Sequence, residues 1–597
     1  MSDGQNEVRA INWQEVFAFS HVFKSFRMAI HPSKLLLALA AVTIIFLGGH
    51  VMDWIWSIGH ASVPVGAIES RRTESVGYND RVRAWKANKP DRAVELYRVA
   101  NGTTVVDQAR TPLSGAFLTA FETQTRDIKA IDLPPGIQAD AERKPWATLR
   151  DAREAMQNRA AAVNAAIDRA YEETSKNISQ PDSLEKIETQ RSNAHQAVFE
   201  FKRTFNAEAL NRVEGRGIFA ELLEHTRSSF TGATMALLRG NILGGLREYQ
   251  NAQRANDGGV VYNLLLMGEG FCWLLREHWI FAAIFLLLSL AVWSLLGGAI
   301  HRIAALQAAR EEKISIRQAL TFSINKFFSF FTAPLIPLVL ILLAGGAVAL
   351  GSLITGNLWG VGAILIGLLL LIALIAGLVM AFLIIGLGAG SGLMYPTVAV
   401  EGSDSFDAIS RSFSYIFARP WRTGLYALAA LVHGSICYLF VRFFAFLLLW
   451  SSHLFVKAGV FYGGEGLPGA SDRIDAMWPK PTFDSLASPG ITEAMSSMER
   501  IGAFLVSVWV YLVVAGVVAF VLSYAASATT VIYYLLRRKV DATDLDDVYV
   551  ESGEDAEEEL PAIEPVAEAP APEAAAAPAE TPPPPEGQPA PPEEPKA

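Results

Sequence analysis

A run of 74 residues between Lys326 and Glu401 contains no Asp, Glu, Lys or Arg. A bilayer core about 30 Å thick is crossed by roughly 20 apolar residues in a helix, so this run is long enough for two crossings. The segment Gly356-Asn-Leu-Trp-Gly would turn the chain between them. Buried helices of soluble proteins rarely extend this far without a charge, so the run predicts an integral membrane protein.

Further apolar runs predict four more crossings. Only segments that pair every backbone group internally can lie in lipid, and a helix satisfies this condition. We therefore predict an all-α fold, a polytopic membrane protein with six transmembrane helices at residues 35–58, 279–300, 327–355, 361–388, 424–455 and 501–536.

Lysine and arginine residues gather beside one end of these spans. They occur in segment 1–34, in segments 301–326 and 389–423, and at residues 537–539. Because basic residues favour the cytoplasmic side of a membrane, we expect both termini in the cytoplasm. We expect the protein in a cell membrane, with the bacterial inner membrane as the best fit. The first three segments are expected to form interfacial amphipathic helices. No cleavage site follows the first span closely, so we expect it to act as an uncleaved signal anchor.

Residues 59–278 form an insert between the first two spans, and this topology places it outside the cytoplasm. Apolar residues at 149–170 and at 184–205 recur every three or four positions, which is typical of helices. Pro181-Asp182 separates the two series, and Asp182 with Glu185 resembles a capping pair. We predict an antiparallel hairpin of the coiled-coil kind within a helical extracytoplasmic domain, against the alternative of one solvated helix. Two more helices are expected near 218–239 and 243–254.

Two other segments differ in composition from the spans. Residues 456–500 are rich in Gly, Pro and Asp and are expected to form an extracytoplasmic loop. Residues 541–597 carry 17 acidic residues and one lysine, together with many prolines and alanines. Such a composition does not support a hydrophobic core, so a disordered cytoplasmic tail is predicted.

An internal repeat is suggested by residues that recur 89 positions apart. Glu312, Ala319, Ser323 and Phe328 correspond in this way to Glu401, Ala408, Ser412 and Phe417. We propose three units, each consisting of an interfacial helix, an outward span, an external connection and an inward span. Chance similarity between apolar sequences is the alternative.

Several motifs resemble a known membrane domain. They are Met394-Tyr-Pro-Thr-Val-Ala-Val-Glu-Gly, Ala408-Ile-Ser-Arg-Ser, Phe417-Ala-Arg-Pro-Trp-Arg and the closing segment 529–541. Together they resemble the membrane domain of bacterial glycerophosphoryl diester phosphodiesterases and related six-span proteins, over residues 279–541. The family commonly has Asp after the paired tyrosines, where this chain has Leu535. The resemblance implies a six-span fold and says almost nothing about activity, because the family's chemistry resides in a separate catalytic barrel, which we do not find in this sequence.

The residues that carry this resemblance are expected to be structural. Pro396 is predicted to stop the fourth span, and Glu401 is predicted to cap or pair with the following helix through Arg411. Basic residues at the end of the sixth span would anchor it to lipid headgroups. A headgroup site built from Arg411, Arg419 and Arg422 is the alternative. The full set comprises Pro396, Glu401, Ala408, Arg411, Ser412, Tyr533, Tyr534, Arg537, Arg538 and Asp541.

Ionisable residues at membrane depth are costly and therefore suggest function. Arg442 lies within the predicted fifth span, and we consider a pair with Asp53 of the first span. The alternative is that Arg442 extends to the interface. His433 is more consistent with a hydrogen-bonded packing residue than with a proton carrier.

No nucleotide loop, zinc helix, cysteine pair or nucleophile elbow is present in the sequence, and we predict no enzyme activity and no cofactor. The first hypothesis is an envelope scaffold whose insert, residues 59–278, binds a protein partner, with membrane lipid as the other partner and no nucleic acid. The alternative is a transporter or lipid-handling protein that uses the repeated hairpins. The sequence leaves the oligomeric state open.

The topology can be tested with a reporter enzyme that is active only in the cytosol. Fused at Asn177, it should be inactive, whereas the same enzyme fused after Asp541 should be active, as measured in intact cells. Activity at Asn177 would invert the predicted orientation.

Overall fold

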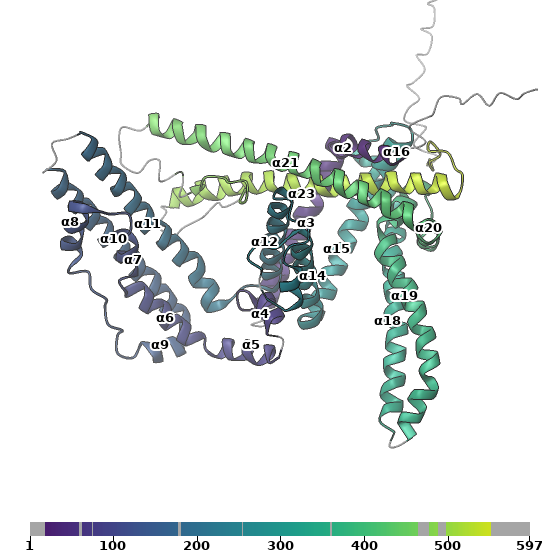
Figure 1. The fold of residues 1–597 in the computed structure, drawn as a ribbon, viewed down its shortest axis with the longest axis horizontal. Helices are drawn as coiled ribbons and strands as arrows, with labels where there is room; N and C mark the ends of the chain where they lie inside the picture. The colour runs from purple at the N-terminus through teal and green to yellow at the C-terminus, as the bar shows by residue number, and fades with distance from the viewer. Residues whose placement is uncertain are drawn as a thin grey trace, which may run out of the picture. The chain divides into compact units, whose positions relative to one another are not determined.

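The computed structural model describes residues 18–58, 62–74, 76–176, 181–253, 255–358, 361–463, 474, 477–486 and 497–550. Within these ranges the chain forms helices and no strand, with one isolated antiparallel bridge between Val63 and Arg216 (Figure 1). The predicted all-helical class is therefore confirmed for the described residues.

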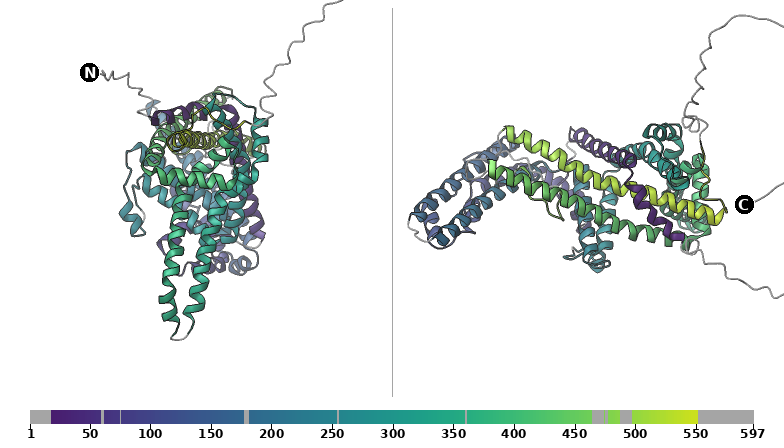
Figure 2. Two further views of the ribbon diagram at one scale, coloured as in Figure 1. Left: turned by 90° about the vertical axis from the view of Figure 1, so that its right-hand side faces the viewer. Right: turned by 90° about the horizontal axis from the view of Figure 1, so that it is seen from above.

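Six helices are long and apolar enough to cross a membrane, as predicted. The third and fourth, α18 and α19, run side by side as a hairpin, and the last two, α21 and α23, also pack together (Figures 1 and 2). The second crossing contains a short π-helical segment, η2, between two α-helices. The elements are α3 (Pro32–Ile58), α15 (Trp279–Val292) with η2 (Trp293–Gly297) and α16 (Gly298–Ala309), α18 (Phe327–Gly356), α19 (Val361–Glu401), α21 (Pro420–Gly463) and α23 (Ser497–Val540).

Several helices extend beyond the predicted spans, most of all at the ends of the second and fourth. The second crossing was expected to end at residue 300, but α16 continues to Ala309 and buries residues 298–306. The fourth was expected to end before Pro396, yet α19 passes through this proline to Glu401. A proline removes one helix hydrogen bond, but residues 393–400 are all buried. Packing around the last turns therefore outweighs the local cost of the proline.

The largest hydrophobic core lies where α16, α19 and α23 end and where α3, α18 and α21 begin. We call this end of the spans the terminal side and their opposite end the insert side. Four shorter elements pack there against the ends of the spans. The core includes Leu306, Met394, Tyr395, Tyr533 and Leu536. The shorter elements are η1 (Ala18–Phe23), α2 (Lys24–Ala29), α17 (Ile316–Asn325) and α20 (Ser405–Ala418).

Positions paired by the suggested repeat have similar environments. Ala319 and Ala408 are fully buried, as are Ser323 and Ser412. Ser323 donates its hydroxyl hydrogen to Leu295 O at 2.6 Å, on the preceding span, and α20 likewise packs on the preceding span α19. These similarities are compatible with the repeat, which stays a prediction.

Most of the described part of the insert is helical. Its helices are α4 (Ala67–Thr73), α5 (Tyr78–Ala87), α6 (Lys89–Asn101), α7 (Thr104–Arg110), α8 (Gly115–Thr125), α9 (Ile137–Arg143), α10 (Pro145–Ser175), α11 (Pro181–Glu214), α12 (Ile218–Leu238), α13 (Leu246–Gln250) and α14 (Val260–Glu277). The predicted helix at 243–254 is shorter than expected, and α14 was not predicted.

The expected helical hairpin consists of α10 and α11, which pack against each other (Figure 1). Val163 and Ile167 from α10 share one core with Val198 from α11, and Met156 and Phe205 share a second. These cores also include residues of α6, α7 and α8. Residues 89–214 therefore have hydrophobic cores of their own.

The two ends of this segment lie together. Lys89, the first residue of α6, forms an ion pair with Glu214, the last residue of α11. Arg92 donates to Arg212 O at 2.7 Å and to Val213 O at 3.2 Å. We call residues 89–214 the insert domain, because the chain leaves and re-enters it at one place.

The insert domain should depend on its own core. Ile167→Ala removes a fully buried side chain and should destabilise the domain by about 2–5 kcal/mol, detected as faster proteolysis of residues 89–214. Ile131→Ala, at a 60% exposed position, is the matched control and should leave the cleavage rate unchanged. Equal rates for the two variants would contradict this core.

Candidate functional site

The terminal side contains a cluster of charged and phenolic side chains at the ends of α19 and α23. We call the following six residues the polar clamp: Glu401, Arg411, Tyr415, Tyr533, Arg537 and Asp541. They come from the end of α19, from α20 and from the end of α23. All six belong to or lie beside the motifs that carry the family resemblance.

Glu401 is the centre of the clamp. The Tyr533 hydroxyl donates to its Oε1 at 2.5 Å. Arg411 Nη1 lies 2.8 Å from its Oε2, and Arg537 Nε lies 3.2 Å from Oε1. The expected pairing of Glu401 with Arg411 is therefore confirmed. Hydrogen bonds from Tyr533 and Arg411 and the nearby charge of Arg537 compensate one largely buried carboxylate that would otherwise be unpaired.

Arg411 extends the clamp toward Asp407 and Asp541. Its Nε lies 3.0 Å from Asp407 Oδ1, and its Nη1 lies 3.9 Å from Asp541 Oδ2. Burial opposes the charge of Arg411, but the hydrogen bond to Asp407 and the charge of Glu401 outweigh it and raise the guanidinium pKa above its usual range. This arginine stays charged and is held by carboxylates, which leaves it unsuited to the headgroup site considered from the sequence.

Tyr415 links α20 to the residue after α23, because its hydroxyl donates to Asp541 Oδ2. Burial and this hydrogen bond raise the pKa of the Tyr415 hydroxyl. The phenol therefore stays protonated and acts as a hydrogen-bond donor. With its donors and acceptors facing one another, the clamp fits a structural role better than acid or base catalysis.

Residues 541–549 continue from the clamp and pack against the same core. Tyr549 donates its backbone N–H to Val400 O at 2.8 Å, and Arg537 Nη2 lies 2.8 Å from Asp547 Oδ2. Val548 is buried. The prediction of disorder from Asp541 onward is wrong for these nine residues, because two apolar side chains, Leu545 and Val548, join the core. Residues 551–597 lie outside the described residues.

The remaining motif residues support the packing around the clamp. Ser412 is fully buried and donates to Ala408 O at 2.6 Å. Tyr534 donates to Ala305 O at 3.1 Å, which connects α23 to α16. Arg538 is exposed and directed away from the core.

The expected pair of Arg442 and Asp53 is not formed. Arg442 donates from Nη2 to Phe483 O at 2.8 Å and from Nη1 to the Tyr438 hydroxyl at 2.7 Å, and its guanidinium lies over the Phe483 ring. The loop after α21 thus supplies carbonyl oxygens to Arg442. No sequence pattern indicates that a backbone carbonyl far along the chain would replace a carboxylate.

Asp53 instead caps the N-terminus of α12. Its carboxyl oxygens accept the backbone N–H groups of Phe219 at 2.8 Å and Ala220 at 2.9 Å. Free N–H groups at a helix start favour such a partner. A Cβ atom at Gly217 would collide with this carboxyl, which explains the glycine. Asp53 therefore joins α3 to the insert.

His433 is a packing residue, as the sequence favoured. Its Nδ1 is 2.9 Å from the Tyr524 hydroxyl, and its ring lies edge-on to Phe23. The hydrogen bond joins α21 to α23.

Sequence reasoning missed two buried cations on the terminal side. Lys34 is fully buried and donates to Gln307 Oε1 at 2.9 Å and to Ser527 Oγ at 3.0 Å. Arg302, also fully buried, donates to Ala399 O at 2.9 Å and lies over the Phe322 ring. Both belong to the basic residues that predict the orientation of the spans. The polar residues Gln307 and Ser527 within apolar helices were the sequence feature that could have indicated buried partners for Lys34.

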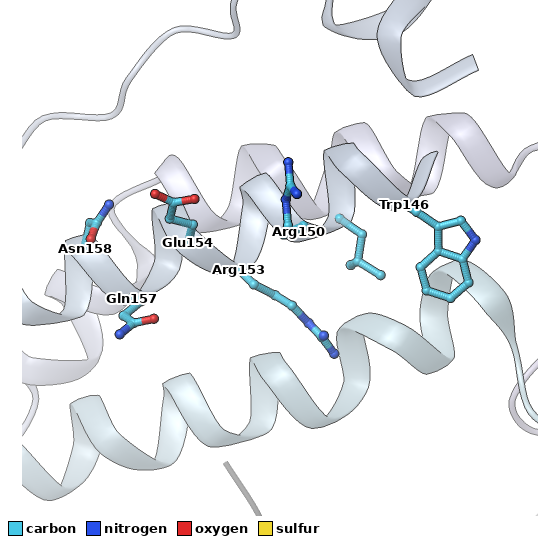
Figure 3. Close-up of a pocket in the computed structure, with 7 residues that line it drawn as sticks. Trp146, Arg150, Arg153, Glu154, Gln157 and Asn158 are labelled. Atoms are coloured by element: carbon cyan, nitrogen blue, oxygen red, sulfur yellow. The ribbon is translucent and has the colours of Figure 1, made fainter. Parts of the chain in front are cut away.

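A shallow hollow of about 520 Å³ lies along α10 in the insert domain (Figure 3). Trp146, Arg150 and Arg153 line it, and the Lys89 ammonium lies 5.3 Å from the Trp146 ring centre. Arg153 also donates to Asn206 O on α11. The hollow thus combines an exposed aromatic ring with two arginines and the carboxylate of Glu154. Within the part of the chain that the structure describes, no group of His, Cys, Asp and Glu residues is arranged to hold a metal ion.

Comparison of the chain with protein-family models, curated proteins and solved structures gave no match. The resemblance carried by residues 394–402 and 529–541 therefore stays a prediction.

The polar clamp can be tested by thermal unfolding of the detergent-solubilised protein. Glu401→Gln removes the carboxylate charge shared by Arg411 and Arg537, and loss of one partner of a buried pair costs about 3–5 kcal/mol. The melting temperature should fall clearly. Asp407→Asn removes a more exposed partner of Arg411, worth about 0–1 kcal/mol. Similar melting temperatures for the two variants would contradict a central role for Glu401.

Proposed function

We propose that this chain is a membrane-anchored scaffold whose insert domain binds an envelope protein outside the cytoplasm. The observation that carries the proposal is the construction of residues 89–214. This domain has its own cores, and its two ends meet at the Lys89–Glu214 ion pair. A helical domain with its own cores, whose two ends meet, is suited to present a surface, although Phe199 of α11 also packs against Ala503 of α23.

The proposed contact surface is the hollow on α10. Trp146 and the arginines 150 and 153 line it, and aromatic and arginine side chains are enriched where proteins bind one another. Acidic groups on the partner would complement the two arginines. The predicted position outside the cytoplasm makes an envelope protein the fitting partner.

The transport alternative is weakened because two charged residues considered for it have other partners. Asp53 and Arg442 were expected to line one path, but Asp53 caps α12 and Arg442 binds loop carbonyls. Each charge already has partners that explain its presence at membrane depth. The bundle therefore fits an anchor better than a substrate path.

Crosslinking in intact cells tests the proposal. A photoreactive residue at Gln157, on the hollow, should form an adduct with one discrete envelope protein. The same residue at Glu95, an exposed position on α6, is the control within the same domain and should not form this adduct. Buried positions such as Leu149 and Ala152 are unsuitable, because they lie in the core.

Deletion of residues 90–213 provides the second arm. A short Gly-Ser linker can close the gap, because Lys89 and Glu214 are in contact. Copurification of the crosslinked partner should be lost in this variant and retained in Arg442→Ala. Retention after the deletion together with loss in Arg442→Ala would place the interaction in the bundle and contradict the proposal.

A further inference from the structure

Helix α14 has apolar residues on its exposed side as well as on its buried side. Trp273 and Leu274 are buried, at 2% and 0% exposure, whereas Leu264 and Phe271 are exposed, at 50% and 44%. A helix on the surface of a water-soluble domain has a polar outer face. The exposed apolar residues indicate that the outer face of α14 contacts something apolar.

The buried polar groups of α14 have partners inside the protein. Asn263 Nδ2 donates to Gly259 O at 2.8 Å, and Trp273 Nε1 donates to the Tyr78 hydroxyl at 3.0 Å. The Tyr262 hydroxyl accepts the Ala255 N–H at 3.1 Å. These hydrogen bonds fix the rotation of the helix, so its apolar face is necessarily turned outward.

The exposed face of α14 forms one stripe at helical spacing. The α14 stripe consists of Leu264, Gly268, Phe271, Cys272 and Leu275. These positions are separated by one, three or four residues, so they lie along one side of the helix. The stripe continues past His278 to Trp279, the first residue of α15, which is 67% exposed. A tryptophan at the start of a span is typical of a membrane interface.

The contacts of α12 place the α12–α14 pair beside three spans, from near the end of α3 to the middle of α21. Asp53 at the end of α3 caps α12, and Phe219 packs against Gly49 and Phe285. Near the other end of α12, Thr234 Oγ1 lies 3.3 Å from the Tyr438 hydroxyl on α21. The pair therefore contacts spans 1, 2 and 5, and α14 is packed against α12.

The charged residues of α12 and α14 lie outside the α14 stripe or at the end of the stripe. Glu269 accepts the Tyr249 hydroxyl at 3.1 Å, and Glu277 accepts Arg71 at 2.6 Å. Arg276 is at the last turn, where a long side chain can extend to water. On α12, Arg227 and Glu224 form an exposed ion pair. One helix thus presents an apolar face and the other a polar face.

We infer that α14 is a monotopic helix that lies in the lipid leaflet on the insert side, with its stripe among the acyl chains. The occupant is lipid and not a partner helix, because the stripe is continuous with the lipid-facing surface of α15 through Trp279 and Ile280. A helix with one apolar and one solvated side is stable at such an interface. This inference goes beyond the proposed scaffold function and does not depend on it.

The native Cys272 lies on the stripe and is exposed, which makes it the probe position. An environment-sensitive fluorophore would be attached to Cys272 of the full chain carrying Cys437→Ala, reconstituted in phosphatidylcholine vesicles that contain doxyl-labelled lipid. We expect blue-shifted emission and quenching that is stronger for a doxyl group near the headgroups than for one near the bilayer centre. The control carries the fluorophore at Ile131→Cys, with both native cysteines replaced by alanine, and should not be quenched.

Two outcomes would overturn the inference. Emission and quenching at Cys272 equal to those at Ile131→Cys would place the stripe in water. A blue shift without lipid quenching, accompanied by Cys272 crosslinks between chains, would assign the stripe to a second copy. A second probe at Leu264→Cys, in the variant without native cysteines, should also be quenched by doxyl-labelled lipid, and the absence of quenching there would contradict a stripe that faces lipid along its length.

Discussion

The fold depends on the cost of leaving a charge unpaired where water is excluded. At the terminal side this cost is met by the polar clamp, in which Glu401 is shared by Tyr533, Arg411 and Arg537. An ion pair of this kind adds little stability over an apolar core, but loss of one member leaves the others uncompensated. The clamp therefore fixes which helix ends meet. The ends of α19 and α23 and the helix α20 are held in one arrangement.

The same principle governs the charges on the insert side, although the partners differ. Asp53 accepts backbone N–H groups of α12, and Arg442 donates to backbone carbonyls near Phe483. Backbone groups at helix ends and in loops carry partial charges that stabilise a side chain of the opposite sign. These two residues tie spans to the segments between them. The ionisable groups that first suggested a transport path are better understood as contacts that hold the spans to the neighbouring segments. The insert domain is then the better candidate for the functional part.

The sequence was sufficient for features that depend on the period and length of apolar runs. The six spans and the helical hairpin of α10 and α11 follow from patterns that extend over many residues, and averaging over them removes local exceptions. The pairing of Glu401 with Arg411 was also accessible, since only ten positions separate them.

Features that depend on contacts distant in the sequence were not accessible. Pro396 continues a helix because neighbouring spans bury the turn around it, and Lys34 is buried because Gln307 and Ser527 reach it from two other helices. Helix α14 was missed because apolar residues occupy its exposed side as well as its buried side, which hides the pattern expected of a water-soluble domain. In each case tertiary packing overrides a local rule.

The most direct test of the account is hydrogen–deuterium exchange of the wild type and of Glu401→Gln in lipid nanodiscs. If the clamp holds the helix ends together, exchange should accelerate in residues 393–401, 405–418 and 529–549. The insert domain, residues 89–214, should be unchanged, because its cores are separate. Uniform acceleration across both regions, or no change at residues 529–549, would contradict the central role of the clamp.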